Sequence, residues 1–243
     1  MYFLRSIFYF IIWWSFTFFW GFVCLLTCWL PFKGRYKIAF IWAWVTIRLA
    51  KIICGINYQI KGTENFPDGP VILLSKHQST WETLFMMLVL PRPVSFVLKK
   101  SLLYIPFFGW VLAFMRMIPI DRNKRTNAFR QMVHVGSERL KNGHWIIIFP
   151  EGTRVPPGAQ GNYQNGGAML AIRTKAQVIP VALNSGECWP KTTIVKTPGT
   201  ITLSFGKPIA TEGKKAEELT KEVKTWIESE MRNISPYLYS DTK

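Results

Sequence analysis

The chain lacks the signature motifs of several common enzyme classes. Its 243 residues contain no Gly-x-Ser-x-Gly elbow, no phosphate-binding loop ending in Gly-Lys-Ser or Gly-Lys-Thr, and no Gly-x-Gly-x-x-Gly after a predicted strand. There are three histidines, none in a His-x-x-Glu-His arrangement, and the four cysteines show no spacing typical of metal ligands. These absences argue against serine hydrolases, P-loop enzymes, dinucleotide-binding enzymes and zinc hydrolases, and we expect no metal site.

Acidic residues are scarce and unevenly placed. The 14 Asp and Glu oppose 30 Lys and Arg, giving a net charge of +16, and no acid precedes Glu64. Hydrophobic residues make up 49% of the chain, which is too many for a disordered polybasic protein. A basic balance suits either nucleic acid or an anionic membrane. Because the acid-free segment is also strongly aromatic, we favour the membrane and expect no nucleic-acid partner.

An uncharged apolar run extends from Ser6 to Phe32. As a helix it would be roughly 40 Å long, which is enough to cross a hydrocarbon core of about 30 Å. The apolar core of a secretory signal peptide is shorter, about 7 to 15 residues. The run therefore predicts a membrane anchor, either spanning or re-entrant.

The segment from Tyr36 to Ile53 places basic and apolar residues on opposite faces of a helix. Lys37 and Lys51 lie on the basic face, and the pattern predicts an interfacial helix in the plane of the membrane. A helix packed on the following domain is the alternative. The cluster that begins with Lys33 and Arg35 places the downstream chain in the cytoplasm, at the inner membrane if the source is bacterial.

We therefore divide the chain into an anchor, residues 1–60, and a cytoplasmic domain, residues 61–243. In the domain, short apolar runs alternate with helical patterns, which predicts an α/β fold with a sheet flanked by helices. The predicted strands are Val71–Ser75, Val94–Leu98, Met117–Ile120, Trp145–Phe149, Val178–Leu183 and Thr200–Phe205. The predicted helices are Trp81–Leu90, Asn127–Asn142, Gly166–Thr174 and Lys214–Ile234.

A histidine and a carboxylate follow the first predicted strand of the domain. His77 lies in the loop after this strand, and Glu82 lies in the first turn of the next helix. A carboxylate there would fix the imidazole tautomer and stabilise the imidazolium, and a substrate hydroxyl would then replace the serine of a hydrolase triad. Ser79 and Glu82 also match a capping box, so a purely structural role is the alternative.

A second motif, Glu151-Gly152-Thr153-Arg154, follows the strand that ends at Phe149. Its guanidinium fork and its glycine-freed backbone N–H groups suit a phosphate. A tight turn with a solvated arginine is the structural alternative.

A third group of residues surrounds the strand predicted at Met117–Ile120. Lys99 or Lys100 can face a developing oxyanion, and Arg122 adds a further cation. Aromatic residues between 104 and 110, next to Gly109, can line a groove for an acyl chain. Core packing and a solvated lysine pair are the alternatives.

These blocks, in this order, resemble those of the 1-acyl-glycerol-3-phosphate O-acyltransferases, or lysophosphatidic acid acyltransferases, of the glycerolipid acyltransferase family. The resemblance covers about residues 70 to 185 and consists of the blocks His77–Glu82, Lys100–Gly109, Ile118–Arg122, Phe149–Arg154 and Val178–Val181. It implies the sheet and helices of that family, with an amino-terminal membrane-anchoring helical segment.

The resemblance also implies a reaction. A fatty acyl group would pass from a coenzyme A or acyl-carrier-protein thioester to the free hydroxyl of lysophosphatidic acid, giving phosphatidic acid without any other cofactor. His77 would be the general base and Glu82 its orienting partner. The implied substrate-binding residues are Glu151, Gly152, Thr153 and Arg154, with Arg122, for the glycerol phosphate, and Lys100 and Gly109 for the acyl chain and oxyanion.

The chain departs from the family pattern at two places. The commoner first motif ends in Asp, whereas Glu82 is one methylene longer. Many relatives carry a Lys after the second motif, where this chain has Gln164 in Asn-Tyr-Gln-Asn-Gly, so the phosphate grip would rest on Arg122 and Arg154. Other acceptors, such as another lysolipid or a lyso-aminolipid, stay open, as does a catalytically silent lipid-binding membrane protein.

Overall fold

The computed structural model describes residues 1–105, 108–121 and 125–239. Its strands are β1 (Ile56–Lys61), β2 (Ile72–Ser75), β3 (Val94–Lys99), β4 (Ile118–Ile120), β5 (Trp145–Ile148), β6 (Val178–Leu183) and β7 (Gly199–Phe205). Its α-helices are α1 (Tyr2–Leu26), α2 (Phe32–Cys54), α3 (Trp81–Val89), α4 (Phe108–Phe114), α5 (Arg125–Lys141), α6 (Gly166–Thr174), α7 (Ser185–Cys188) and α8 (Ala216–Ile234). Short 3₁₀ helices lie at η1 (Thr63–Asn65), η2 (Lys100–Tyr104) and η3 (Pro236–Leu238).

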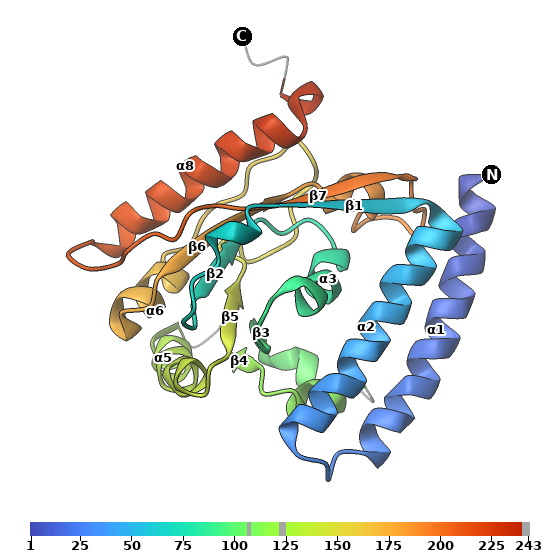
Figure 1. The fold of residues 1–243 in the computed structure, drawn as a ribbon, viewed down its shortest axis with the longest axis horizontal. Helices are drawn as coiled ribbons and strands as arrows, with labels where there is room; N and C mark the ends of the chain where they lie inside the picture. The colour runs from blue at the N-terminus through green and yellow to red at the C-terminus, as the bar shows by residue number, and fades with distance from the viewer. Residues whose placement is uncertain (106–107, 122–124, 240–243) are drawn as a thin grey trace.

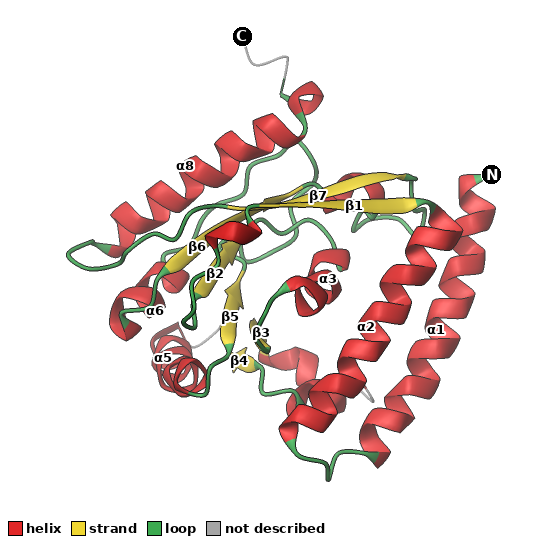
Figure 2. Ribbon diagram, in the orientation of Figure 1, coloured by secondary structure: helices red, strands yellow, loops and turns green. Residues whose placement is uncertain are grey.

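The strands form one sheet in the order β1-β7-β6-β2-β5-β3-β4. Helices α5, α6 and α8 cover one face, and α1 to α4 lie on the other, so the predicted α/β architecture is confirmed (Figures 1 and 2). All six predicted strands are present with ends within one residue of those expected, and the four helices predicted for the domain have ends within two.

β1 was not predicted. It pairs in parallel with β7 at the edge of the sheet, from Ile56 opposite Gly199 to Lys61 opposite Ser204. Only Ile56 is buried, and most of the other side chains face solvent although apolar and polar residues alternate along the strand. The strand lies across the boundary that we drew between residues 60 and 61.

The direction of the strands positions the site. β6, β2, β5, β3 and β4 are mutually parallel, and β7 runs antiparallel to β6. The loops that leave the carboxyl ends of the five parallel strands therefore gather at one edge of the sheet, where open α/β sheets bind their ligands.

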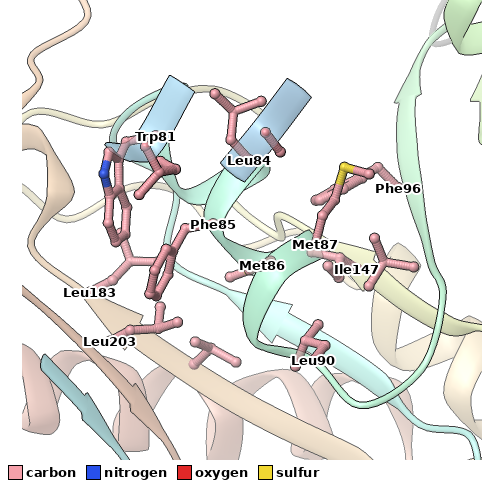
Figure 3. Packing of buried hydrophobic residues seen from close by; sticks show 14 of the residues in the cluster. Trp81, Leu84, Phe85, Met86, Met87, Leu90, Phe96, Ile147, Leu183 and Leu203 are labelled. Carbon is pink, nitrogen blue, oxygen red and sulfur yellow. The ribbon is translucent and has the colours of Figure 1, made fainter. Parts of the chain in front are cut away.

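Helix α3 holds the end of the His77–Glu82 segment against the sheet. Its Trp81 and Phe85 rings stack with centroids 4.3 Å apart and pack towards Leu183 and Leu203 of the sheet (Figure 3). Met86 of the same helix is fully buried. Burial of this kind stabilises by roughly 1.5 to 3 kcal/mol per large apolar side chain, so the first turn of α3 has a firmly fixed position.

Helices α1 and α2 form an antiparallel hairpin along one side of the domain (Figure 1). The apolar run does not form one helix to Phe32, because α1 ends at Leu26 and the chain turns before Pro31. Among the described residues, α1 is the one helix long and apolar enough to cross a membrane by length and composition.

α2 buries a face of small residues, including Ala39, Ala43 and Ala50, which lets it pack closely on its neighbours α1 and α3. Ile41 and Ile52, two apolar residues of this helix, are exposed. The buried face of α2 therefore packs on the domain, as the alternative prediction stated.

Candidate active site

His77 and Glu82 form a hydrogen-bonded pair at the carboxyl end of β2. His77 Nδ1 lies 2.8 Å from Glu82 Oε1, and the imidazole is 17% exposed while the carboxylate is fully buried. We assign the proton to Nδ1, because a carboxylate accepts hydrogen bonds, and Nε2 then carries the free lone pair. Within the described part of the chain, no group bonds Nε2. The pair is therefore arranged to accept a proton.

Both oxygens of Glu82 are held. Oε1 also accepts the backbone N–H groups of Gln78 at 2.9 Å and Ser79 at 2.8 Å, and Oε2 accepts the hydroxyl of Ser185 at 2.6 Å. The bond from the Ser79 N–H is the carboxylate half of the capping box that the sequence suggested. One carboxylate therefore both caps α3 and orients His77, and its extra methylene still reaches the imidazole.

The loop after β5 supports His77 from the other side. The imidazole stacks on the ring of Phe149, with centroids 3.8 Å apart and planes at 15°. The carbonyl of His77 accepts the N–H of Val155 at 2.7 Å, and its own N–H donates to Glu151 Oε2 at 3.0 Å. The second sequence motif thus fixes both the ring plane and the backbone of the histidine.

Arg154 lies beside the loop that carries His77. Its Nη1 donates to Thr80 Oγ1 at 3.1 Å, and the side chain is half-buried. Gly152 has a φ of +68° and its N–H donates to the carbonyl of Phe149 at 2.9 Å, which makes the tight turn that presents the loop. Thr153 is exposed on the same turn.

Glu151 is placed differently from a substrate ligand. Its side chain is fully buried, Oε1 receives Lys76 Nζ at 2.8 Å and the Gly161 N–H at 3.1 Å, and Oε2 receives the His77 N–H. The carboxylate therefore holds protein groups together instead of facing the acceptor.

The third sequence group is only partly brought to the site. Lys100 follows β3 at the same edge of the sheet and is exposed. Gly109 is buried where α4 packs on η2, and a Cβ there would lie 2.3 Å from the carbonyl oxygen of Leu103, so close packing requires the glycine. Tyr104 and Trp110 are exposed instead of lining a closed groove. Arg122 lies outside the described residues.

Sequence reasoning missed Ser185 and Lys76. Ser185 follows β6, whose carboxyl end lies beside that of β2, so its position at a strand end was the available signal. Lys76 precedes His77 directly and is fully buried, which a lone lysine in the sequence does not reveal. Elsewhere in the described residues, no group of three or more His, Cys, Asp and Glu side chains could hold a metal ion.

Comparisons with known proteins agree with this geometry. The family model described as Acyltransferase matches residues 57–184, which include β1, the His77–Glu82 pair and the Arg154 loop. The chain belongs to this acyltransferase family. The matched region ends just after β6. Ser185 and helix α8 therefore lie outside the family model.

Individual members of the acyltransferase family resemble the chain over most of its length. It is 43% identical over 211 residues to a 1-acyl-sn-glycerol-3-phosphate acyltransferase of Pseudomonas aeruginosa, covering 85% of this chain and 82% of the relative. It is 30% identical to the protein of that name from Saccharomyces cerevisiae, covering 80% of this chain and 65% of the relative. The crystal structure of the 1-acyl-sn-glycerophosphate acyltransferase of Thermotoga maritima superposes with a TM-score of 0.78 at 25% identity, covering 96% and 95% of the two chains.

Proposed function

We propose that the protein transfers a fatty acyl group from an acyl thioester to the free hydroxyl of lysophosphatidic acid, producing phosphatidic acid. The observation that carries the proposal is the 2.8 Å contact of His77 Nδ1 with the buried Glu82 carboxylate, which leaves Nε2 as a base. The names of the relatives support the acceptor, since those reported above act on 1-acylglycerol phosphates.

The reaction needs one base and no added cofactor. His77 Nε2 takes the proton of the acceptor hydroxyl while the oxygen attacks the thioester carbonyl. Glu82 stabilises the imidazolium that forms. The tetrahedral intermediate then expels the thiolate, the carbon–sulfur bond breaks, and the imidazolium returns the proton to sulfur. The thioester of coenzyme A or of acyl-carrier protein supplies the activation.

The acceptor phosphate would lie at the Arg154 loop. The guanidinium carries five N–H donors, and the bond to Thr80 uses one of them, so a fork remains for phosphate oxygens. Thr153, exposed on the same turn, brings its hydroxyl to this place. Lys100, which follows β3 at this edge of the sheet, would add positive charge, and Arg122 is proposed as a second cation for the phosphate from the sequence alone.

For location, the structure favours a monotopic attachment through α1. Tyr9 and Trp13 of α1 pack edge-on against Trp189 of the domain, and the far end of α1 contacts α4, so the helix is held to the domain along its length. Its opposite face is exposed and aromatic, with Phe8 58% and Phe19 64% exposed. A helix held in this way would insert one face into the cytoplasmic leaflet while the domain stays in water.

The decisive experiment measures acyl transfer in vesicles with panels of thioester donors and lysolipid acceptors. The unmodified protein should use lysophosphatidic acid, and His77→Ala should lower turnover by roughly a hundredfold or more. His134→Ala is the matched control, because His134 is exposed on α5 and should leave the rate unchanged. Preference for a lysolipid without a phosphate monoester would favour the lyso-aminolipid alternative, and binding without any turnover would favour a silent lipid-binding protein.

A further inference from the structure

A buried ammonium group sits directly behind the catalytic histidine. Lys76 Nζ donates to Glu151 Oε1 at 2.8 Å, to Glu228 Oε1 at 2.9 Å and to the carbonyl of Ala159 at 3.0 Å. The Lys76 and Glu151 side chains are 0% exposed, and that of Glu228 is 13% exposed. All three ammonium protons are therefore used within the protein.

The ammonium group of Lys76 stays charged, and the neighbouring phenol of Tyr163 keeps its proton. Burial lowers the pKa of Lys76, but the two carboxylates outweigh burial and raise the pKa above its usual value. The hydroxyl of Tyr163 donates to Glu228 Oε1 at 2.7 Å, and burial together with Glu151 and Glu228 raises the pKa of this phenol, so it remains a donor. The cluster has one cation and two carboxylates.

The cluster connects three segments that are distant in sequence. Lys76 directly follows β2, Glu151 follows β5, and Glu228 lies on α8. Glu151 links the cluster to His77, because its Oε2 accepts the backbone N–H of His77 at 3.0 Å. A Cβ at Gly161 would lie 2.7 Å from Glu151 Oε1, so even the neighbouring turn is shaped around this carboxylate.

Stability does not explain why such a cluster is present. Desolvating charges offsets much of their attraction, and apolar replacements of buried ion pairs are often neutral or stabilising. Its contacts instead converge on the backbone of His77 and on the loop that carries Arg154. What the cluster adds is a fixed geometry for these two groups.

We infer that Lys76 and Glu228 are positioning residues for acyl transfer: through Glu151 they hold the His77 backbone and the Arg154 loop, and they make helix α8 part of the catalytic machinery. The inference rests on the proposed function for His77 and Arg154. It extends the functional part of the chain to residue 228, beyond the matched region at 57–184.

Two substitutions test the inference. Lys76→Met removes the ammonium, and Glu228→Gln keeps the volume and one acceptor oxygen while leaving a neutral Lys76–Glu151 pair, so it is the variant expected to fold. Both should lower kcat, by on the order of ten- to hundredfold for Lys76→Met and less for Glu228→Gln, because small misplacements of catalytic groups have effects of this size. The Michaelis constant for the thioester should change little. Glu222→Gln, on the exposed face of α8, is the matched control.

The pH–rate profile separates positioning from general structural support. The charged groups that face the His77 loop are Glu82, Glu151, Lys76 and, beside Thr80, Arg154. Lys76→Met leaves an extra negative charge near the imidazole and should move the acidic limb of kcat to higher pH, whereas Glu228→Gln removes a negative charge and should move it to lower pH. Opposite shifts support the inference, and unchanged limbs with unchanged kcat in the folded variants overturn it.

Amide hydrogen exchange gives a readout that does not depend on the acceptor. In Glu228→Gln, the amides of residues 76–79 and 151–155 should exchange faster than in the unmodified protein, while those of α3 and α6 should not. If the unmodified protein acylates no lysolipid, the proposed function fails, but exchange still decides whether the cluster orders the loop. Unchanged exchange in both segments would overturn the inference whatever the activity.

Discussion

The hydroxyl of Ser185 lies 2.6 Å from Glu82 Oε2, on the oxygen that does not contact His77. Ser185 is fully buried and follows β6, so a second strand end fixes the carboxylate from behind. The bond is charge-assisted, and such bonds contribute about 1.5 to 3 kcal/mol. Ser185 therefore determines which way the Glu82 carboxylate faces.

Replacing Ser185 with alanine should lower kcat by roughly tenfold, because the carboxylate loses one of the bonds that set its plane. The Michaelis constants for both substrates should stay within about twofold, since the hydroxyl contacts no substrate. Ser204→Ala is the matched control: Ser204 is also buried and donates to a carboxylate, that of Glu230, at 2.8 Å. Steady-state kinetics of both variants test this, and equal losses would assign Ser185 a stability role only.

Substitutions of Glu82 distinguish capping from catalysis. Glu82→Gln keeps an oxygen for the N–H groups of Gln78 and Ser79 but removes the charge, and we expect turnover to fall by roughly a hundredfold. Glu82→Asp keeps the charge but is too short to reach both His77 and Ser185. Its rate should therefore lie between that of the unmodified protein and that of Glu82→Gln. A nearly silent Gln variant with an unchanged melting temperature would show that the carboxylate serves only as a helix cap.

The sequence was most informative where contacts are local. His77 and Glu82 are five residues apart on one loop and helix, so their pairing follows from the motif itself. Ser185 meets Glu82 across 103 residues, and Glu228 meets Lys76 across 152. Periodicity and spacing carry no information about such distant partners, so these contacts could be found only from the fold.

The same limit explains which strands could be predicted from the sequence. The central strands were predicted because they are continuous apolar runs, buried on both faces of a parallel sheet. β1 lies at the edge and alternates apolar and polar residues over six positions, Ile-Asn-Tyr-Gln-Ile-Lys, but only Ile56 is buried, and the strand is completed by its pairing with β7. Gly109 was assigned to the substrate side, whereas its tight contact with Leu103 depends on how α4 folds onto η2.

Removing apolar side chains from the outer face of α1 should weaken membrane binding. Phe8, Ile11 and Phe19 lie on one side of the helix and are 58%, 58% and 64% exposed. Changing all three to serine should weaken vesicle binding by about 6 kcal/mol, at about 2 kcal/mol per side chain. Met169→Ser, at an exposed apolar position on α6, is the control. Sedimentation with vesicles after a carbonate wash measures this, and full retention of the triple variant would contradict insertion of this face.

Acidification should destabilise the domain through His144. Burial lowers the pKa of His144 to about 4, with help from the Arg116 and Arg139 guanidinium groups. Below about pH 6.5 the unfolded chain binds a proton that the folded protein does not. The free energy of unfolding therefore falls, by roughly 3 kcal/mol in total, as the pH drops from about 6.5 towards 4.

The variant His144→Asn cannot take up this proton. Its melting temperature should start lower at pH 7.5, because contacts with Ser95 and Phe32 are lost, but should fall less steeply between pH 6.5 and 5 than that of the unmodified protein. His134→Asn, at an exposed site, should keep the full slope. Parallel melting curves for all three proteins across this range would show that His144 does not control the acid response.

Arg154 should determine affinity for the acceptor phosphate. A bidentate contact with a phosphate monoester is worth on the order of 1.5 to 3 kcal/mol, so Arg154→Ala should raise the Michaelis constant for lysophosphatidic acid by roughly ten- to hundredfold. Arg154→Lys keeps the charge but loses the planar guanidinium fork and its hydrogen bond to Thr80. Its Michaelis constant for lysophosphatidic acid should therefore rise less than that of Arg154→Ala. Arg173→Ala removes an exposed cation on α6 and controls for net charge. The Michaelis constant for the thioester should stay nearly constant in all three variants. If Arg154→Ala affects only the thioester, the loop binds the donor, and the phosphate of the acceptor must be held by other cations at this edge of the sheet.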